Sequence, residues 1–323
     1  MQQSEEVGVV PQSGQAAKSR LYTYTVGICA TGSPPTLQPL LSTVLATEMR
    51  GFELRKVVLV ASDCSSDTLI MARDVAARDQ RIKLIEHDKR TCKADAINEV
   101  FRETEGDFLV YVNADALVST KSIPALLKSI EEDDGAGFIS GRPIFERPKG
   151  LVSDVLEVMW TSFNLLSSDP DQTEQSNHGT DELMAIRSEL LTELPQGVVN
   201  DGAYIAGRIR ESGFRVGFQP DAVVQIDVPR RMVDLIRQRR RILFGHIQVK
   251  RLVGKAPRTV ETMMFFSPSQ SFKIVIGMLA TKPRLIPVLP LAAMGELIAL
   301  SGALWDTVSS SQSHAVWRRY EQR

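Results

Sequence analysis

The sequence predicts an α/β fold in which a mainly parallel sheet is flanked by helices. Three observations support this prediction. Short apolar runs alternate with helix-like segments from residue 24 onward, and the runs are apolar at nearly every position. Strands buried on both faces give such continuous runs, and parallel strands need helical crossovers between them. The chain has 323 residues, 43% hydrophobic and 24% charged, which is long enough for a substantial core.

Strands and helices are expected to alternate from Tyr24 onward. Four β-rich runs predict strands at Tyr24–Cys29, Lys56–Ser62, Ile82–Glu86 and Phe108–Asn113. Helices are predicted between them, from Pro34 to about Thr47, at Asp67–Asp79 and at Thr91–Thr104. Two prolines suit the first turn of the first of these helices. Further helices are predicted at Gly202–Ser212, with Asn200 as its N-cap, and at Arg230–Arg251.

Polar residues fall where a sheet of this type binds its ligands. In open α/β sheets the ligand lies beyond the carboxyl ends of the strands. Asp63 follows the second predicted strand, Asp115 follows the fourth, and Lys93 opens the helix between them. We therefore expect these side chains to belong to one binding site.

The charges balance in total but not along the chain. Lys plus Arg number 38 and Asp plus Glu 39, a net charge of −1, so no general basic field predicts a nucleic-acid partner. Residues 230–258 nevertheless hold ten basic residues and a single acidic one, Asp234. Such a segment faces phosphates, an anionic membrane surface or water.

Several enzyme classes are poorly supported by the motifs present. The sequence has no GxGxxG or GxxxxGK[ST] loop, which disfavours dinucleotide-dependent redox chemistry and P-loop phosphoryl transfer. It also has no GxSxG motif, which disfavours a serine hydrolase. Its three cysteines form no CxxC pair, so free thiols are expected.

The two ends of the chain predict a cytoplasmic protein with a membrane-associated tail. Residues 1–20 are expected to form a disordered leader without a secretory signal. Leu285–Leu304 is twenty residues with one charge, Glu296, which is long enough to span a bilayer. Met263–Ala280 fits an interfacial helix better. Pro287 and Pro290 weaken a membrane span, so a re-entrant or surface-lying hairpin and a buried core hairpin remain open.

Six polar segments follow one another in a recognisable order. They are Asp63 in SDCSSD, Lys93 with Asn98 in CKADAIN, Asn113 to Asp115, His178 to Thr180 followed by Arg187 in LMAIRSELL, Asn200 with Asp201, and Gln238 to Arg241 as QRRR. This order resembles that of the family 2 glycosyltransferases, inverting enzymes of GT-A fold that include cellulose synthase and polyprenyl-phosphate sugar synthases. The resemblance covers roughly Tyr24 to Gly245.

The resemblance implies a role for each segment. Asp63 would hold the nucleobase and Lys93 would lie beside the diphosphate. Asn113 and Asp115 stand at the metal-binding DxD, with Asp115 as a ligand of Mn²⁺ or Mg²⁺. The remaining roles are acceptor binding by His178, Gly179 and Arg187, general-base catalysis by Asp201, and diphosphate binding by Gln238, Arg240 and Arg241.

These roles also make physical sense without the family. A departing nucleoside diphosphate gains negative charge, which a divalent cation and fixed cationic donors stabilise. Asp115 can offer oxygen to the cation, and arginines form bidentate bonds to phosphates. An attacking hydroxyl needs a carboxylate nearby to take its proton, whereas a phosphate acceptor needs none, so Asp201 favours a hydroxyl acceptor.

Two departures from the family pattern carry predictions of their own. Asn113 replaces the first acidic residue of the DxD, which predicts weak metal affinity without loss of phosphate-assisted coordination. Ile242 replaces the tryptophan of QxxRW and removes a platform on which an acceptor sugar would stack. A single transfer is therefore favoured over processive polymer synthesis.

The sequence thus predicts a membrane-associated inverting glycosyltransferase at the cytoplasmic face of the cell membrane. It would move one sugar from a UDP- or GDP-linked donor to a hydroxyl or phosphate of a lipid-linked or glycan acceptor, near anionic lipid. Four parts are expected: the leader, a GT-A nucleotide-sugar domain at 21–229, a basic helix completing the site at 230–258, and a membrane-associated tail at 259–323. The alternatives are a noncatalytic GT-A scaffold and a sugar-1-phosphate nucleotidyltransferase, for which Cys29–Pro35 is a poor glycine-rich loop.

Overall fold

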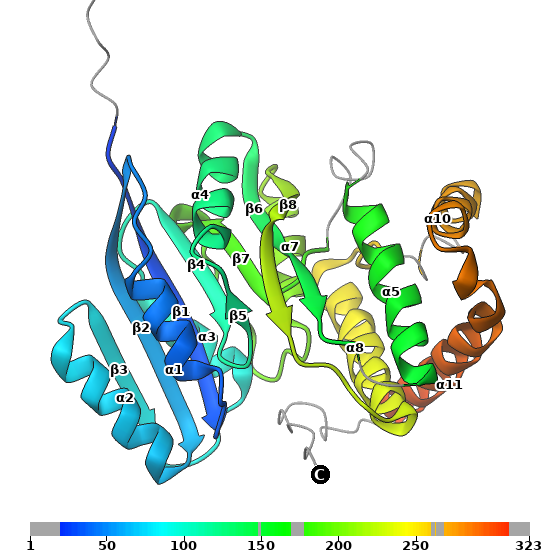
Figure 1. The fold of residues 1–323 in the computed structure, drawn as a ribbon, viewed down its shortest axis with the longest axis horizontal. Coiled ribbons are helices and arrows are strands. Elements are labelled where there is room, and N and C mark those ends of the chain that lie inside the picture. Colours follow the sequence, from blue (N-terminus) through cyan, green and yellow to red (C-terminus); the bar gives the residue numbers. More distant parts are fainter. Residues whose placement is uncertain (1–19, 148–149, 169–177, 260–261, 263–267, 310–323) are drawn as a thin grey trace, which may run out of the picture.

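The computed structural model describes residues 20–147, 150–168, 178–259, 262 and 268–309. Its centre is an eight-stranded sheet with strand order β3-β2-β1-β4-β7-β6-β8-β5, with helices on both sides (Figure 1). The α/β fold predicted from the alternating runs is confirmed. The expected leader, apart from residue 20, lies outside the described residues.

The first half of the sheet is fully parallel, as the apolar runs predicted. Its strands are β1 (Tyr22–Gly32), β2 (Phe52–Cys64), β3 (Ile82–His87) and β4 (Phe108–Asn113). The crossovers are helices α1 (Leu37–Leu45), α2 (Ser66–Arg78) and α3 (Lys93–Arg102). β1 pairs with both β2 and β4, so the carboxyl ends of these three strands meet at one edge of the sheet.

The second half of the sheet contains two reversed strands. After β5 (Leu117–Val118) and α4 (Ser122–Glu132) come β6 (Ala136–Phe145), α5 (Leu151–Ser168), β7 (Leu183–Arg187), η1 (Ser188–Leu190), α7 (Asp201–Glu211) and β8 (Arg215–Ile226). β7 runs antiparallel to β4 and β6, and β5 runs antiparallel to β8. The other six strands share one direction. As a result, the beginning of β7, and not its end, lies beside the end of β4.

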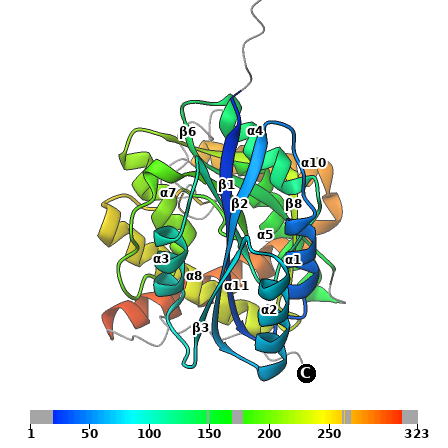
Figure 2. The same ribbon diagram turned by 90° about the vertical axis from the view of Figure 1, so that its left-hand side faces the viewer.

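Two hydrophobic cores cover the two faces of the sheet. One face packs against α1, α2 and α4, with side chains such as Leu40 and Leu126 fully buried. The other face packs against α3, α7 and the end of α8 (Met232–Val253), with Ile97 and Ile209 between the layers. Figure 2 shows α1 and α2 on one side of the sheet and α3 and α7 on the other.

The end of the described chain forms a helical unit beside the sheet. It consists of α5, α8, α10 (Pro268–Thr281), η2 (Pro283–Val288) and α11 (Leu289–Val308), with a small core of its own. Residues 283–308 make one helical stretch long and apolar enough to cross a membrane, and only 22% of its most apolar window is buried. That exposure contradicts the buried core hairpin that the sequence left open.

Candidate active site

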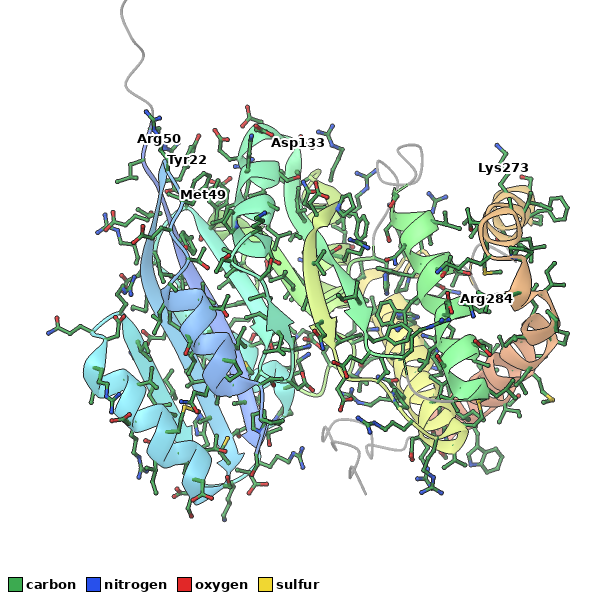
Figure 3. The ribbon with its side chains drawn as sticks, in the orientation of Figure 1. Tyr22, Met49, Arg50, Asp133, Lys273 and Arg284 are labelled. Carbon is green, nitrogen blue, oxygen red and sulfur yellow. The ribbon has the colours of Figure 1, made fainter. Side chains whose placement is uncertain are left out.

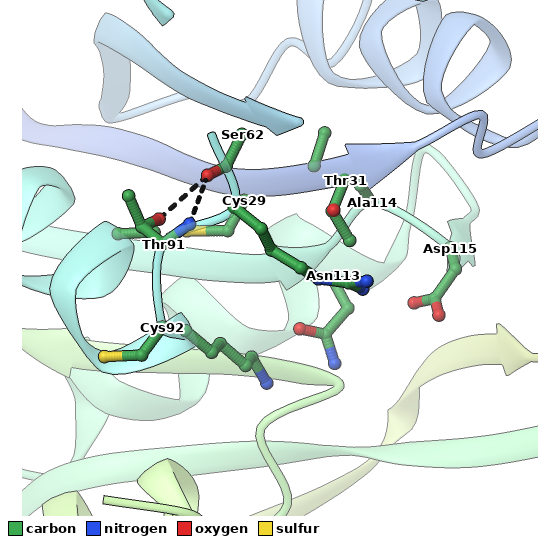
Figure 4. A pocket seen from close by; sticks show the side chains of 12 residues that line it. Cys29, Thr31, Ser62, Thr91, Cys92, Asn113, Ala114 and Asp115 are labelled. Carbon is green, nitrogen blue, oxygen red and sulfur yellow. Dashed lines mark hydrogen bonds between the residues drawn. The ribbon is translucent and has the colours of Figure 1, made fainter. Parts of the chain in front are cut away.

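A pocket opens at the edge where the parallel strands end. It is lined by residues from the ends of β1, β2 and β4 and from the start of α3: Cys29, Ala30, Thr31, Ser62, Arg90, Thr91, Cys92, Lys93, Ala96, Asn113, Ala114 and Asp115. Thr91 is held in the wall because its backbone N–H donates to the Ser62 hydroxyl at 3.0 Å (Figure 4). The structure therefore brings Lys93 and Asp115 together, two of the three residues that the strand-end rule placed in one site, and Asn113 lies beside them.

The turn after β4 is fastened to the start of β7 by Glu182. The Asn113 side-chain amide donates to Glu182 Oε2 at 2.9 Å, and the Asn113 backbone N–H donates to the Glu182 carbonyl at 3.3 Å. Asn113 and Asp115 project toward the same side of the pocket (Figure 4). A carboxyl group thus stands beside the position where Asn113 replaces the first acid of the DxD.

Behind the pocket wall, Lys93 joins two carboxylates. Its ammonium contacts the Asp181 carboxylate and lies 3.0 Å from Asp201 Oδ2. The Asp201 side chain is 5% exposed and the Lys93 side chain 17%. Lys93 is therefore engaged by acids, and the carboxylate of Asp201 sits directly behind a residue of the pocket wall.

This cluster holds its carboxyl groups in different protonation states. Burial and then the charge of Asp181 raise the pKa of Asp201 to about 6. Burial alone would also raise the pKa of Asp181, but the Lys93 charge lowers it to about 2. Burial, followed by the charges of Asp181 and Asp115, raises the pKa of Glu182 to about 8. At neutral pH Asp201 is then a carboxylate with a pKa close to the working range of a general base.

Asp201 is placed by the start of α7 and by close helix packing. Asn200 caps the helix, because its side-chain oxygen accepts from the backbone N–H of Ala203 at 3.1 Å. A side chain at Gly245 of α8 would meet the Cβ of Asn200 at 2.7 Å, so only glycine lets α8 approach this cap. The N-cap role predicted for Asn200 is confirmed.

Two histidines connect the predicted acceptor segment to α8. The Nε2 atoms of His178 and His246 lie 3.2 Å apart, and their rings meet edge to face. Burial, together with the charge of His178, lowers the pKa of His246 well below the usual histidine value. One ring nitrogen of the pair must donate and the other accept, so the neutral form of His246 matches this contact.

The predicted QRRR motif divides between two neighbours. Arg239 and Arg240 turn toward α11, where Arg239 Nε lies 2.6 Å from Glu296 and Arg240 Nε lies 2.6 Å from Asp306. Gln238 and Arg241 precede Gly245 by two turns and one turn, so they share the face of α8 that packs on Asn200. The predicted diphosphate contact of Arg240 is thus replaced in this structure by an ion pair.

Two other predicted residues lie apart from the pocket. Arg187 ends β7, and because this strand is antiparallel its guanidinium lies at the opposite edge of the sheet, donating to the carbonyls of Ile130, Asp133 and Ala136. Asp63 is exposed and follows Ser62 of the wall. It has φ 52°, the one left-handed non-glycine residue in the described part of the chain.

The oxygen donors at the pocket fit a hard divalent cation. Asp115 offers a carboxylate and Asn113 an amide oxygen, which Mg²⁺ and Mn²⁺ accept as ligands. Within the described residues no group of three His, Cys, Asp or Glu side chains forms a complete metal site. A cation bound here would therefore need phosphate oxygens of the nucleotide as further ligands.

Sequence reasoning missed Asp181, Glu182 and His246 as members of this site. Asp181 and Glu182 stand directly before the apolar run LMAIR, in the same short segment as His178 and Gly179. Two adjacent acids at the start of a buried strand were the available signal. They reach the pocket because β7 is reversed, which the run itself does not reveal.

Comparisons with known proteins identify the family and the fold. The family model described as Glycosyl transferase family 2 matches residues 25–194, just over half of the chain. A similar solved structure is the mannosyltransferase PcManGT from Pyrobaculum calidifontis, in complex with GDP-Man and Mn²⁺. It has a TM-score of 0.61 and 22% identity, over 92% of this chain and 86% of that one.

A second similar structure is GalNAc-T7 with UDP, GalNAc and Mn²⁺. Its TM-score is 0.50 and its identity 16%, over 71% of this chain and 50% of that one. At these identities the likeness establishes the GT-A fold. A search of the curated proteins gave no significant match.

Proposed function

Because this chain belongs to glycosyl transferase family 2, we propose that it transfers one sugar from a nucleotide-sugar donor to an acceptor hydroxyl, with inversion at the anomeric carbon. The donor is UDP- or GDP-linked, and the acceptor is a lipid-linked or surface glycan at the cytoplasmic face of the membrane. Residues 21–229 form the nucleotide-sugar unit, the helix within 230–258 completes the site, and 259–323 attaches it to the membrane.

The observation that carries this proposal is the Lys93 cluster behind the pocket wall. Asp201 is a buried carboxylate whose pKa of about 6 suits proton uptake near neutral pH. Asp201 shares the Lys93 ammonium with Asp181, which contacts the same nitrogen. One cation facing two carboxylates leaves net negative charge in the cluster, which suits a group that must take up a proton.

The transfer step uses these residues as follows. The acceptor oxygen attacks the anomeric carbon on the face opposite the diphosphate, and the bond from that carbon to the phosphate oxygen breaks. The electron pair of the broken bond leaves with the nucleoside diphosphate, and the hydroxyl proton passes to Asp201. Gln238 and Arg241, on the face of α8 that packs on Asn200, supply donors for the diphosphate oxygens.

The same pocket would hold the divalent cation. Asp115 and the side-chain oxygen of Asn113 are the ligands that the chain provides, and Glu182 holds the Asn113 amide in place. When bound, Mn²⁺ or Mg²⁺ neutralises the charge that develops on the leaving diphosphate. Asp63, beyond the wall, contacts the nucleobase, and the segment of His178 and Gly179 receives the acceptor.

A donor panel tests the proposal. Purified protein is incubated with UDP- and GDP-sugars plus Mn²⁺, and release of nucleoside diphosphate is measured. We expect turnover with at least one donor, and Asp201→Asn should lower it by about 10²- to 10⁴-fold while donor binding persists. The matched control is Glu211→Gln at the exposed end of the same helix, which should leave turnover unchanged.

Three outcomes would count against the proposal. Full turnover by both Asp201→Asn and Asp115→Ala would identify a contaminating enzyme. Donor binding without transfer would favour the noncatalytic scaffold, the reading to which the substitution at Asn113 points. Absence of binding to every donor would remove both.

A further inference from the structure

Helix α11 has its polar and apolar faces reversed relative to a helix on the surface of a soluble protein. Large hydrophobic side chains recur at helical spacing on its exposed side. They are Met294, Leu297, Ile298, Leu304, Trp305 and Val308, each at least 50% exposed. Its two acidic residues, Glu296 and Asp306, point inward. A surface helix in water normally turns its charged residues outward.

The inward acids are neutralised by α8. Arg239 forms two hydrogen bonds to the Glu296 carboxylate, at 2.6 and 3.1 Å. Arg240 forms two to the Asp306 carboxylate, at 2.6 and 2.5 Å. Between these pairs Leu243 packs on Ala299 and Ala303. Both charged residues of α11 therefore face α8, and its outer face is apolar.

The apolar exposure continues onto the neighbouring elements. Phe272 and Ile276 of α10 are 65% and 48% exposed, and Ile286 of η2 is 49% exposed. Nine of the fifteen exposed large hydrophobic side chains of the described residues lie between Phe272 and Val308. An accumulation of this kind marks an interaction surface.

The charges around this face are cationic. From Pro268 to Val308 the only acids in the sequence are the two that α8 neutralises, whereas Lys273 projects from the outer side of α10 (Figure 3). The adjoining α8 adds Arg237, whose side chain is 71% exposed and lies 3.3 Å from Asp234 Oδ1. An apolar face with cations around it complements an anionic lipid surface.

We propose that the outer face of α10, η2 and α11 lies flat on the membrane, with α11 parallel to the bilayer plane. A span is disfavoured because α8 contacts α11 near its middle and toward its end. A spanning α11 would draw Arg239 and Arg240, and the charged helix behind them, into the hydrocarbon. This inference deepens the membrane part of the proposed function and specifies which surface meets the lipid.

Flotation of the full chain with vesicles tests this surface. We use vesicles of phosphatidylcholine alone and of phosphatidylcholine with phosphatidylglycerol in equal parts. We expect binding to the anionic vesicles, weakened by salt, and a loss of about tenfold or more in Leu297→Asp. The matched control is Ile70→Asp on α2, because Ile70 and Leu297 are both 63% exposed. Thermal melts show whether each variant is folded, and Ile298→Asp gives a second variant of the face.

The outcomes separate this inference from the transferase proposal. Extraction of bound protein by alkaline carbonate supports the flat orientation, and resistance to it overturns that orientation in favour of a span. Equal binding by Leu297→Asp and Ile70→Asp, or no flotation, overturns the surface. A dimer in light scattering that Leu297→Asp dissociates would show that a second copy covers the face. Vesicle binding without binding of any donor would leave this surface standing and remove the transferase.

Discussion

Two regions of the molecule bury carboxylates against cations, and they do so in different proportions. Behind the pocket wall, the Lys93 ammonium contacts the Asp181 carboxylate and lies 3.0 Å from Asp201 Oδ2. Between α8 and α11, Arg239 contacts Glu296 and Arg240 contacts Asp306. One cation thus serves two carboxylates behind the pocket wall, whereas each acid of α11 contacts a different arginine.

This difference in the number of cations per carboxylate distinguishes the reactive cluster around Lys93 from the structural contact between α8 and α11. A carboxylate paired with its own cation keeps a low pKa and is a poor acceptor of a substrate proton. Behind the pocket wall, burial and then the charge of Asp181 raise the pKa values of Asp201 and Glu182, and the Lys93 charge offsets this only in part, so these groups are able to exchange protons or accept a cation. The arginine pairs of α8 instead fix the position of α11.

The largest expected effect is that of removing the shared cation. Lys93→Met takes the cation from Asp201, which is 5% exposed, and from Asp181, which is 25% exposed, so we expect the free energy of unfolding to fall by about 3–5 kcal/mol in urea titrations at neutral pH. The control is Lys56→Met, because the Lys56 side chain is 19% exposed, much like Lys93, and also contacts two carboxylates, but those of Glu103 and Glu105 are 28% and 59% exposed. It should cost about 1 kcal/mol or less. Equal costs for the two variants would refute the idea of a strained buried cluster.

A smaller effect is expected at the balanced contact. Arg240→Met removes the arginine that contacts Asp306, whose side chain is 6% exposed, but the arginine itself is 40% exposed. We expect a loss of about 1–2 kcal/mol, reduced by solvent screening. Adding Asp306→Asn should restore most of it, since a balanced pair can be removed as a unit. A double variant as unstable as Arg240→Met would show that the two residues cannot be removed as a unit.

The first half of the fold could be predicted because its strands are buried on both faces. Continuous runs such as FLVYVN at Phe108–Asn113 leave little choice of structure, and the strand-end rule then located Lys93 and Asp115 at the pocket, although Asp63 does not line it. The direction of β7 could not be predicted, because an apolar segment does not indicate whether it pairs parallel or antiparallel with its neighbouring strands. In a parallel strand Arg187 would stand at the pocket, whereas in the reversed strand the acids before Leu183 do.

The tail shows a second limit of the sequence. Leu285–Leu304 was apolar enough to span, and hydropathy does not reveal which side of a helix is covered. The decisive contacts join α8 to α11 across more than fifty residues of chain. In the same way, the basic run of α8 indicated phosphate or lipid, but only packing shows that Arg240 faces Asp306 and not the pocket.

The pH dependence of transfer probes the unbalanced cluster. With a pKa of about 6, Asp201 loses its ability to take a proton as the pH falls, so kcat/KM should drop tenfold per pH unit below about pH 6. Because the charge of Asp181 helps to raise this pKa, Asp181→Asn should move the acidic limb to lower pH. The profile of nucleotide release between pH 4 and 8 measures both. An acidic limb that Asp181→Asn leaves in place would contradict the coupling.

The smallest expected effect comes from adding one more acid to the pocket. Asn113→Asp removes the amide that donates to Glu182 and places a carboxylate beside an existing excess of them. Without metal the variant should melt lower than the parent chain, because like charges repel. With Mn²⁺ and a nucleoside diphosphate it should gain more, by about 1 kcal/mol, since a bound cation supplies the missing positive charge. Melting curves with and without Mn²⁺ measure this difference, and Thr31→Ser in the same wall is the control. An equal gain in both proteins would mean that residue 113 does not face the cation.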